Sequence, residues 1–185
     1  MEEGGRSAPV EDAAAALTRD QVLAVAGTLN LKMGGVGVIP PLSAEEILAA
    51  RMPQLWPENP DPSEHRRRSV YLQMKRSMTL PMLQIFDAPD TATSCPRRES
   101  STVAPQALAL MNSEFSAAQS KQFASRIAKQ AGESADASVE AAWRLAFGRP
   151  PAAEELRTAL DYVKRNSLPR LCLLLFNMSE FIYVD

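Results

Sequence analysis

Apolar residues recur at helical spacing through the C-terminal half of the chain, and this periodicity constrains the fold more than any other feature. The clearest stripe ends at Gly148, with Pro150 behind it, the usual punctuation of a helix C-terminus. It consists of Val139, Ala142, Trp143, Ala146 and Phe147. Similar stripes predict helices over 115–131 and 156–163. A broader stripe over 171–182 predicts a central buried helix.

The N-terminal half carries fewer helical signals. One helix, expected to stop before the Gly-rich stretch 31–42, is predicted by the spacing of Val22, Val25, Ala26 and Leu29. Ser43 and Glu46 form a capping box for a short helix. Apolar residues then alternate with polar ones from Val70 to Met74. This is strand periodicity, although a short extended segment or an irregular helix fits the same residues.

These patterns predict a mainly α protein. We expect an irregular multi-helix domain with long Pro-rich connections and at most one short strand or hairpin, since 14 of the 185 residues are prolines. Residues 1–10 are predicted to be disordered. Residues 11–185 are predicted to form a single helical domain, which with 45% hydrophobic residues can bury a real core.

Charge and hydropathy exclude several classes of partner. Twenty basic and 22 acidic residues give a net charge of −2, whereas a nucleic-acid-binding domain usually has a basic excess. The longest apolar run, Leu171–Phe176, is too short to span a bilayer. The first 20 residues contain no apolar segment of the kind found in a signal peptide. We therefore expect neither nucleic acid nor a membrane as a partner.

The residues most often used in catalysis are sparse. The spacing of Cys95 and Cys172 matches no zinc, haem or redox motif, so we expect two buried thiols. A disulfide between them is the alternative if the compartment is oxidising. The single histidine, His65, lies in a Pro- and Arg-rich connection, where a solvated side chain is expected. No catalytic residue, metal site or cofactor is assigned to this chain. We favour a noncatalytic role, although the sequence does not decide between this role and an enzymatic one.

Charged residues concentrate in two places, the loop 86–102 and the basic run 66–76. Arginines and carboxylates there can pair with each other in a buried polar network. The alternative is a site that binds an anion. The Gly-rich "MGGVGV" is not a phosphate-binding loop, because no Lys-Ser/Thr pair follows it. The candidate polar-network or anion-binding residues are Arg67, Arg68, Arg76, Asp87, Asp90, Cys95, Arg97, Arg98, Glu99, Asn112, Asn177 and Glu180.

Several phrases in the right order resemble one family. They are "GTLNLKMGGVGVIPPL", "RRSVYLQMKRSMTLPMLQIFDAPD", "SCPRRESSTVAPQALALMN", "AWRLAFGRPPAAEE" and "NMSEFIYVD". Together they resemble the C-terminal portion of the planctomycete-type family called domain of unknown function 1553, from about Leu17 to Asp185. Val36 stands where the family pattern leads us to expect proline.

The resemblance implies an architecture and no reaction. Such domains are expected at the C-terminal end of large exported proteins, periplasmic or on the cell surface, with a cytochrome c domain upstream that would hold the haem. This chain then corresponds to a truncated or split part of such a protein. Its expected partners are the upstream domains or a partner chain of the same system.

Two functions remain as hypotheses. The preferred one is a noncatalytic helical module that packs against or docks to other domains of a larger exported protein. The alternative is an anionic-ligand site, for binding or processing a sulfated or carboxylated glycan, built from the arginine clusters and the loop acids.

Overall fold

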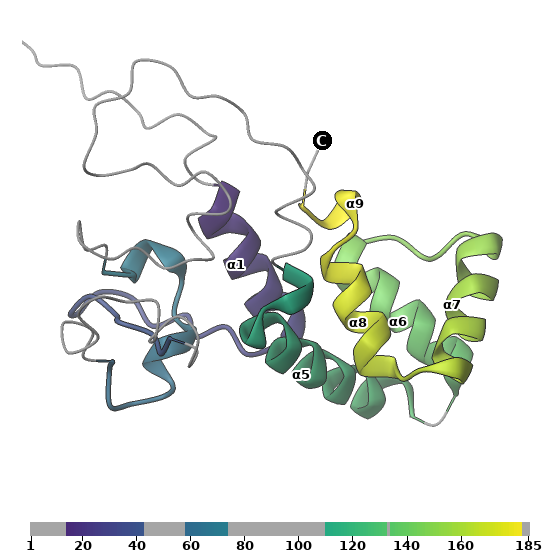
Figure 1. Ribbon diagram of the computed structural model, residues 1–185, viewed down its shortest axis with the longest axis horizontal. Coiled ribbons are helices and arrows are strands. Elements are labelled where there is room, and N and C mark those ends of the chain that lie inside the picture. Colours follow the sequence, from purple (N-terminus) through teal and green to yellow (C-terminus); the bar gives the residue numbers. More distant parts are fainter. Residues whose placement is uncertain (1–13, 43–57, 74–109, 133, 183–185) are drawn as a thin grey trace, which may run out of the picture.

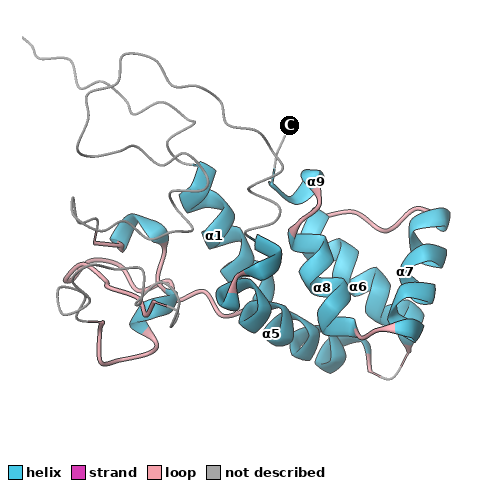
Figure 2. Cartoon of the chain, viewed as in Figure 1, coloured by secondary structure: helices cyan, strands magenta, loops and turns pink. Residues whose placement is uncertain are grey.

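The computed structural model describes residues 14–42, 58–73, 110–132 and 134–182, and the chain is mainly helical there (Figure 1). No strand occurs in these ranges (Figure 2), which confirms the predicted fold class. The described elements in chain order are α1 (Ala14–Ala26), η3 (Glu64–Arg66), η4 (Ser69–Tyr71), α5 (Glu114–Ala131), α6 (Ala135–Phe147), α7 (Ala153–Arg165), α8 (Leu168–Phe176) and α9 (Ser179–Ile182).

Helix α5 joins the two sides of the molecule. It packs against α8 and α6 on one side and against α1 on the other (Figure 1). The irregular segments 27–42 and 58–73 lie beyond α1, at the end of the molecule away from α7 (Figure 1). No helix in the described ranges combines the length and the apolar character needed to cross a bilayer.

Local sequence signals set the helix ends. The hydroxyls of Ser113, Ser134 and Ser167 each accept a hydrogen bond from a backbone N–H in the first turn of the helix that follows, which satisfies an otherwise unpaired donor. Gly148 ends α6 in the left-handed conformation at a φ of 72°. The predicted helices over 115–131 and 156–163 and the predicted end at Gly148 are therefore confirmed.

The hydrophobic core lies between α5 and α8, with α1, α6 and α9 around it. The rings of Phe123 and Phe176 stack with their centroids 5.7 Å apart, and Phe181 lies 5.3 Å from Phe176. All three are buried, as are Val22 of α1 and Trp143 of α6. Burying a side chain of this size contributes roughly 1.5–3 kcal/mol, so this cluster is the main source of stability in the described bundle.

The prediction of one helix over 171–182 is wrong, because two helices occupy that stripe. Helix α8 ends at Phe176 and α9 begins at Ser179. The side-chain Nδ2 of Asn177 donates to the Leu173 carbonyl, 2.7 Å away, and competes there with the backbone hydrogen bonds of a continuing helix. The apolar periodicity continues across the break, so the break could not be seen from the stripe alone.

The first helix ends earlier than predicted. Helix α1 stops at Ala26, and Gly27 follows with a positive φ of 73°, so Leu29 lies beyond the helix. The Arg126 guanidinium of α5 donates to the carbonyls of Ala24 and Val25, at 2.9 and 2.8 Å. A helix C-terminus leaves such carbonyls unpaired, so an arginine from another helix caps α1 here.

The strand periodicity from Val70 to Met74 does not become a strand within the described residues. Ser69–Tyr71 is a turn of 3-10 helix, η4, and Val70 is exposed within it. Leu72 is buried and forms an isolated parallel bridge with Val38. Of the alternatives left open by the sequence, the short irregular helix is the one observed. The predicted disordered residues 1–10 and the predicted Ser43–Glu46 capping box lie outside the described residues.

Candidate functional site

A Gly-rich loop, residues 31–37, forms the candidate site together with the segment that it crosses. Backbone hydrogen bonds fix both ends of the loop. The Asn30 N–H donates to the Arg66 carbonyl at 2.9 Å, and the Val38 N–H donates to the Tyr71 carbonyl at 2.7 Å. The loop between these two anchors therefore arches over one side chain of the facing segment.

That side chain is Arg67, which is only 1% exposed. Its Nε donates to the Lys32 carbonyl at 3.2 Å, its Nη1 to the Val36 carbonyl at 3.3 Å, and its Nη2 to the Gly34 carbonyl. The guanidinium also lies over the Tyr71 ring, with its central carbon 4.1 Å from the ring centroid. All three nitrogens of Arg67 are therefore engaged inside the molecule.

Glu64 supplies the negative charge beside Arg67. Its two oxygens have different partners: Oε2 accepts from Arg67 Nη1 at 3.1 Å, and Oε1 accepts from Lys32 Nζ at 2.6 Å. These contacts, chiefly the hydrogen bond from Lys32, lower the pKa of the Glu64 carboxyl. Glu64 thus remains ionised at neutral pH and ties the start of the loop to the buried arginine.

A second buried arginine, Arg19 of α1, supports the same segment from the other side. Its Nη1 donates to the Arg67 carbonyl at 2.9 Å and to Ser69 Oγ at 3.2 Å, and its Nη2 donates to the His65 carbonyl. Asp20 accepts from both the N–H and the Oγ of Ser69, each at 2.7 Å. Burial lowers the pKa of Arg19 to about 10, and the Asp20 charge opposes that shift, so the guanidinium stays protonated at neutral pH.

The loop exposes apolar side chains while its carbonyls accept from Arg67. Leu31, Met33 and Val36 are 70%, 85% and 84% exposed. We call these three side chains the apolar tip. Large apolar side chains are usually buried, so three exposed ones within six residues mark a surface suited to another apolar surface.

The orientation of the loop decides which ligand charge it can accept. A phosphate-binding loop presents backbone N–H groups to its ligand, whereas this loop presents carbonyl oxygens to a cation. Gly34 and Gly35 adopt positive φ values of 71° and 85°, which let the backbone turn its carbonyls toward the guanidinium. The loop therefore faces the guanidinium with carbonyl oxygens.

Five of the sequence-predicted site residues lie within the described ranges, and they fall in separate places. The Arg67 side chain lies under the Gly-rich loop and binds its carbonyls. The side chain of the next residue, Arg68, is 58% exposed, and its Nε lies 3.7 Å from an Asp20 oxygen. Asn112 is exposed just before α5. Asn177 and Glu180 lie at the α8–α9 junction, so the structure does not bring them to Arg67. The other candidates lie outside the described residues: Arg76, Asp87, Asp90, Cys95, Arg97, Arg98 and Glu99.

Glu180 belongs to a second charged cluster, centred on Arg149 between α6 and α7. Arg149 donates two hydrogen bonds to Glu155, each of 2.8 Å, and two to Glu180, each of 2.7 Å. Glu155 also accepts from the Ala152 N–H at 2.6 Å. The hydrogen bonds from Arg149 are the main cause that lowers the pKa of Glu155 to about 2, and the hydrogen bond from the Ala152 N–H adds to this effect. Arg149 also lowers the pKa of Glu180. The cluster links α9 to the start of α7.

Sequence reasoning missed Arg19, Asp20 and Glu64. A signal for Arg19 was present, because it precedes Val22 by three positions and Ala26 by seven, which places it on the buried face of the helix. Burial of a charged side chain on that face requires acceptors from elsewhere in the fold. Their location in the segment after Ser63 carried no sequence signal, since the pairing spans more than 40 residues.

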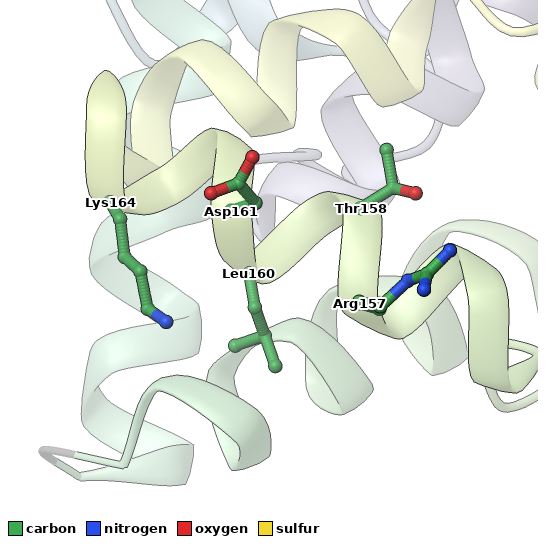
Figure 3. Close-up of a pocket in the computed structure, with 5 residues that line it drawn as sticks. All are labelled: Arg157, Thr158, Leu160, Asp161 and Lys164. Carbon is green, nitrogen blue, oxygen red and sulfur yellow. The ribbon is translucent and has the colours of Figure 1, made fainter.

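A shallow depression of about 500 Å³ lies along α7 (Figure 3). It is lined by Arg157, Thr158, Leu160, Asp161 and Lys164, all from this one helix. Figure 3 shows Thr158 and Asp161 on one side of α7 and Leu160 and Lys164 on the other, so their functional groups do not converge on a common point. We assign no ligand to this depression.

Few of the described groups suit metal binding or nucleophilic chemistry. Within the described residues, no group of three or more His, Cys, Asp or Glu side chains is placed to hold a metal ion. Cys172 is a buried free thiol, as predicted, and burial raises its pKa to about 12. His65 is half-buried, and its Nε2 lies 2.7 Å from the Asn59 carbonyl, so the expectation of a solvated histidine is wrong.

Comparison with known proteins identifies a family and no activity. No curated protein and no solved structure matches the chain. A family model described as "PSD1: Protein of unknown function (DUF1553)" matches residues 7–163. That range contains the Gly-rich loop, Arg67 and four of the five phrases on which the sequence resemblance rests, while "NMSEFIYVD" lies beyond it. The chain therefore belongs to the PSD1 (DUF1553) family of proteins of unknown function.

Proposed function

We propose that this chain is a noncatalytic helical module that docks, through the apolar tip, to another domain of a larger exported protein. The observation that carries the proposal is the exposure of Leu31, Met33 and Val36 on a loop whose backbone Arg67 holds. The larger protein is the architecture that the family resemblance leads us to expect.

The tip suits docking because it is held in place before a partner arrives. Full burial of three such side chains would contribute roughly 1.5–3 kcal/mol each. A loop that must order on binding loses part of that gain to conformational entropy. Here the Arg67 hydrogen bonds to Lys32 and Val36 hold the loop already, so less of the gain is lost.

Charges around the tip define the partner's chemistry. Lys32, within the loop, and Arg68, on the segment below it, are each 58% exposed, and Arg66 is also exposed. These basic side chains lie on the loop and on the segment that it crosses. The complementary surface is an apolar pocket with an acidic rim on the neighbouring domain.

The second candidate function, an anionic-ligand site, is favoured by the exposure of Arg66 and Arg68 on adjacent turns of the same segment. Arg67 does not contribute, because its donors already bind loop carbonyls and Glu64. A thermal-shift titration with a sulfated disaccharide tests this function. Stabilisation that is lost in Arg66→Ala/Arg68→Ala would support it, and the absence of any shift would exclude it.

A selection from a random peptide display library tests docking and its chemistry together. Wild-type protein is expected to enrich peptides that combine large apolar residues with Asp or Glu. Met33→Ser/Val36→Ser should lose these peptides, and Met111→Ser, an exposed methionine before α5, should retain them. No enrichment, or equal enrichment by the Met33→Ser/Val36→Ser protein, would overturn the docking proposal.

Binding to phosphatidylserine vesicles in place of peptides would assign the tip to a lipid surface and would equally contradict the proposal. Arg66→Glu/Arg68→Glu provides a charge control, because it should shift the enriched peptides from acidic to basic.

A further inference from the structure

We propose that the 32–36 loop, with Glu64 and Tyr71, is a guanidinium-binding site that Arg67 occupies as a tethered ligand. The site is distinct from the docking surface: it is formed by the backbone of the loop and the facing segment, whereas the apolar tip is formed by exposed side chains. It can be tested without any docking partner.

The acceptors match the donors of a planar guanidinium. The carbonyls of Lys32, Gly34 and Val36 come from alternate residues of one loop, and each accepts from a different nitrogen of Arg67. A Glu64 oxygen takes a further hydrogen bond from Nη1 at 3.1 Å. A guanidinium carries five N–H groups in a fixed plane, whereas an ammonium carries three in a tetrahedral arrangement. Four acceptors spread over three nitrogens therefore select the guanidinium.

The face of the ion is recognised as well as its edge. Tyr71 lies under the Arg67 guanidinium at 4.1 Å, within range of a cation–π interaction. The Tyr71 hydroxyl accepts from the Gly34 N–H at 3.2 Å, which fixes the ring to the same loop that supplies the carbonyls. Edge acceptors and ring thus form one unit.

The loop backbone forms one wall of the site, opposite the side chains of Glu64 and Tyr71. Gly35 has a positive φ of 85°, and a Cβ built on it would lie 3.9 Å from Arg67 Nη1. Because backbone hydrogen bonds anchor the loop at Asn30 and Val38, truncation of Arg67 leaves both ends of the loop in place, and a bound guanidinium can draw its carbonyls back together. Truncation of Arg67 should then leave a site lined by three loop carbonyls and by the Glu64 carboxylate, whose other oxygen still binds Lys32 Nζ.

The ligand class that this site takes is therefore a small alkylguanidinium. In an Arg67→Ala protein, ethylguanidinium carries the planar head and the two missing carbons of the stem, Cγ and Cδ. We expect the amide resonances of Gly34, Gly35 and Gly37 to move away from their wild-type positions in Arg67→Ala. They should return toward them, saturably, at about 20 mM ethylguanidinium, far below the molar range in which guanidinium salts unfold domains.

Three controls make the rescue specific. Ammonium and urea at the same concentration should leave the resonances unmoved. Wild-type protein should not respond, because its site is full. Arg67→Ala/Glu64→Gln should bind ethylguanidinium at least tenfold more weakly, since the charged acceptor is gone. A response to urea, a response of the wild type, or no saturable response would each overturn the proposal.

A measurement on the unmutated side chain covers the case in which Arg67→Ala does not fold. In the wild-type protein the Arg67 Nε–H should exchange with solvent at least tenfold more slowly than that of Arg157, whose side chain is 80% exposed. Glu64→Gln should accelerate the exchange. An Arg67 exchange rate equal to that of Arg157 would contradict the site.

Failure of this proposal and failure of docking are separable. Met33→Ser/Val36→Ser changes the tip and should leave Arg67 Nε–H exchange slow. If peptides bind wild type but ethylguanidinium does not rescue Arg67→Ala, only the guanidinium site fails. If rescue occurs and no peptide binds, only docking fails.

Discussion

Arg19 Nη1 donates a 2.9 Å hydrogen bond to the backbone carbonyl of Arg67, so one buried arginine supports the backbone of the other. The two guanidinium groups connect different pairs of segments. Arg19 connects α1 to the segment after Ser63, and Arg67 connects that segment to the Gly-rich loop. These two sets of hydrogen bonds attach a loop without regular secondary structure to the helical bundle.

Arg67→Ala is expected to destabilise the protein strongly. The change removes the donors of three loop carbonyls and one of the two partners of the Glu64 carboxylate, which keeps Lys32. Removing the donor of a buried acceptor costs roughly 1–3 kcal/mol, so we expect a total loss of about 3 kcal/mol of unfolding free energy. Arg68→Ala is the matched control, because its exposed ion pair with Asp20 should contribute about 0.5 kcal/mol. Urea unfolding of both variants measures the difference, and equal losses would argue against the role of Arg67.

Arg19→Met should also destabilise, by about 2 kcal/mol. Methionine retains an unbranched, flexible stem, although a shorter one, and donates nothing, so the carbonyls of Arg67 and His65 lose a buried partner. Arg157→Met on the exposed face of α7 should change the unfolding free energy by less than about 0.5 kcal/mol. If the two variants unfold at the same urea concentration, Arg19 does not hold α1 to the segment after Ser63.

Gly34→Ala tests the backbone conformation of the loop. Gly34 has a φ of 71° and no atom within 4 Å of a built Cβ, so alanine there meets strain without a clash. The expected loss is about 1 kcal/mol, with weaker peptide binding at the apolar tip. Gly37→Ala, in the same loop without a positive φ, should lose less. Urea unfolding compares them, and a Gly37→Ala variant that is the less stable of the two would contradict this account.

The Arg149 cluster predicts a dependence of stability on pH. The folded-state pKa of Glu155 is about 2, below its ordinary value of 4.5, and the pKa of Glu180 is also lowered. A carboxyl with a depressed pKa stabilises the fold above its unfolded pKa and loses that contribution as pH falls toward the folded value. The melting temperature should therefore fall between pH 4.5 and pH 2, and Arg149→Gln should flatten that fall. An unchanged slope in Arg149→Gln would assign the dependence to other carboxyls.

Cys172 should resist alkylation in the folded protein. Burial raises its pKa to about 12, so almost none of the thiol is ionised at pH 8, and the side chain is out of contact with solvent. Iodoacetamide treatment at pH 8, followed by mass spectrometry of the Cys172 peptide, should show protection in buffer and full modification in denaturant. Fast modification in buffer would place α8 closer to solvent than the structure does.

Features that depend on residues close together in the sequence were mostly predictable, and features that depend on distant residues were not. The ends of α5, α6 and α7 depend on residues within one or two turns, such as Ser134 and Gly148, and were predictable. The break at Asn177 depends on one side chain that competes with the helix backbone, which periodicity does not report. The turn at Gly34 and Gly35 is also a local effect, because glycine readily adopts a positive φ.

The candidate site was predictable only in part. Arg67 was a candidate because it lies in a basic run, but its partners Lys32, Gly34 and Val36 are more than 30 positions away. The sequence placed it in a charge-paired network with acids of the 86–102 loop, which lies outside the described residues. Within the described residues its acceptors are chiefly backbone carbonyls, which every residue carries and which no sequence pattern singles out.

Arg67 holds the loop and does not bind an external anion. The most direct test is to follow the Arg67 Nε–H resonance of the wild-type protein by NMR during a titration with sodium sulfate, against a sodium chloride series of equal ionic strength. We expect the Arg67 resonance to coincide in the two series while exposed arginines such as Arg68 respond to the added anion. A saturable, sulfate-specific shift of Arg67 would show that its guanidinium is available to an anion and would contradict the account.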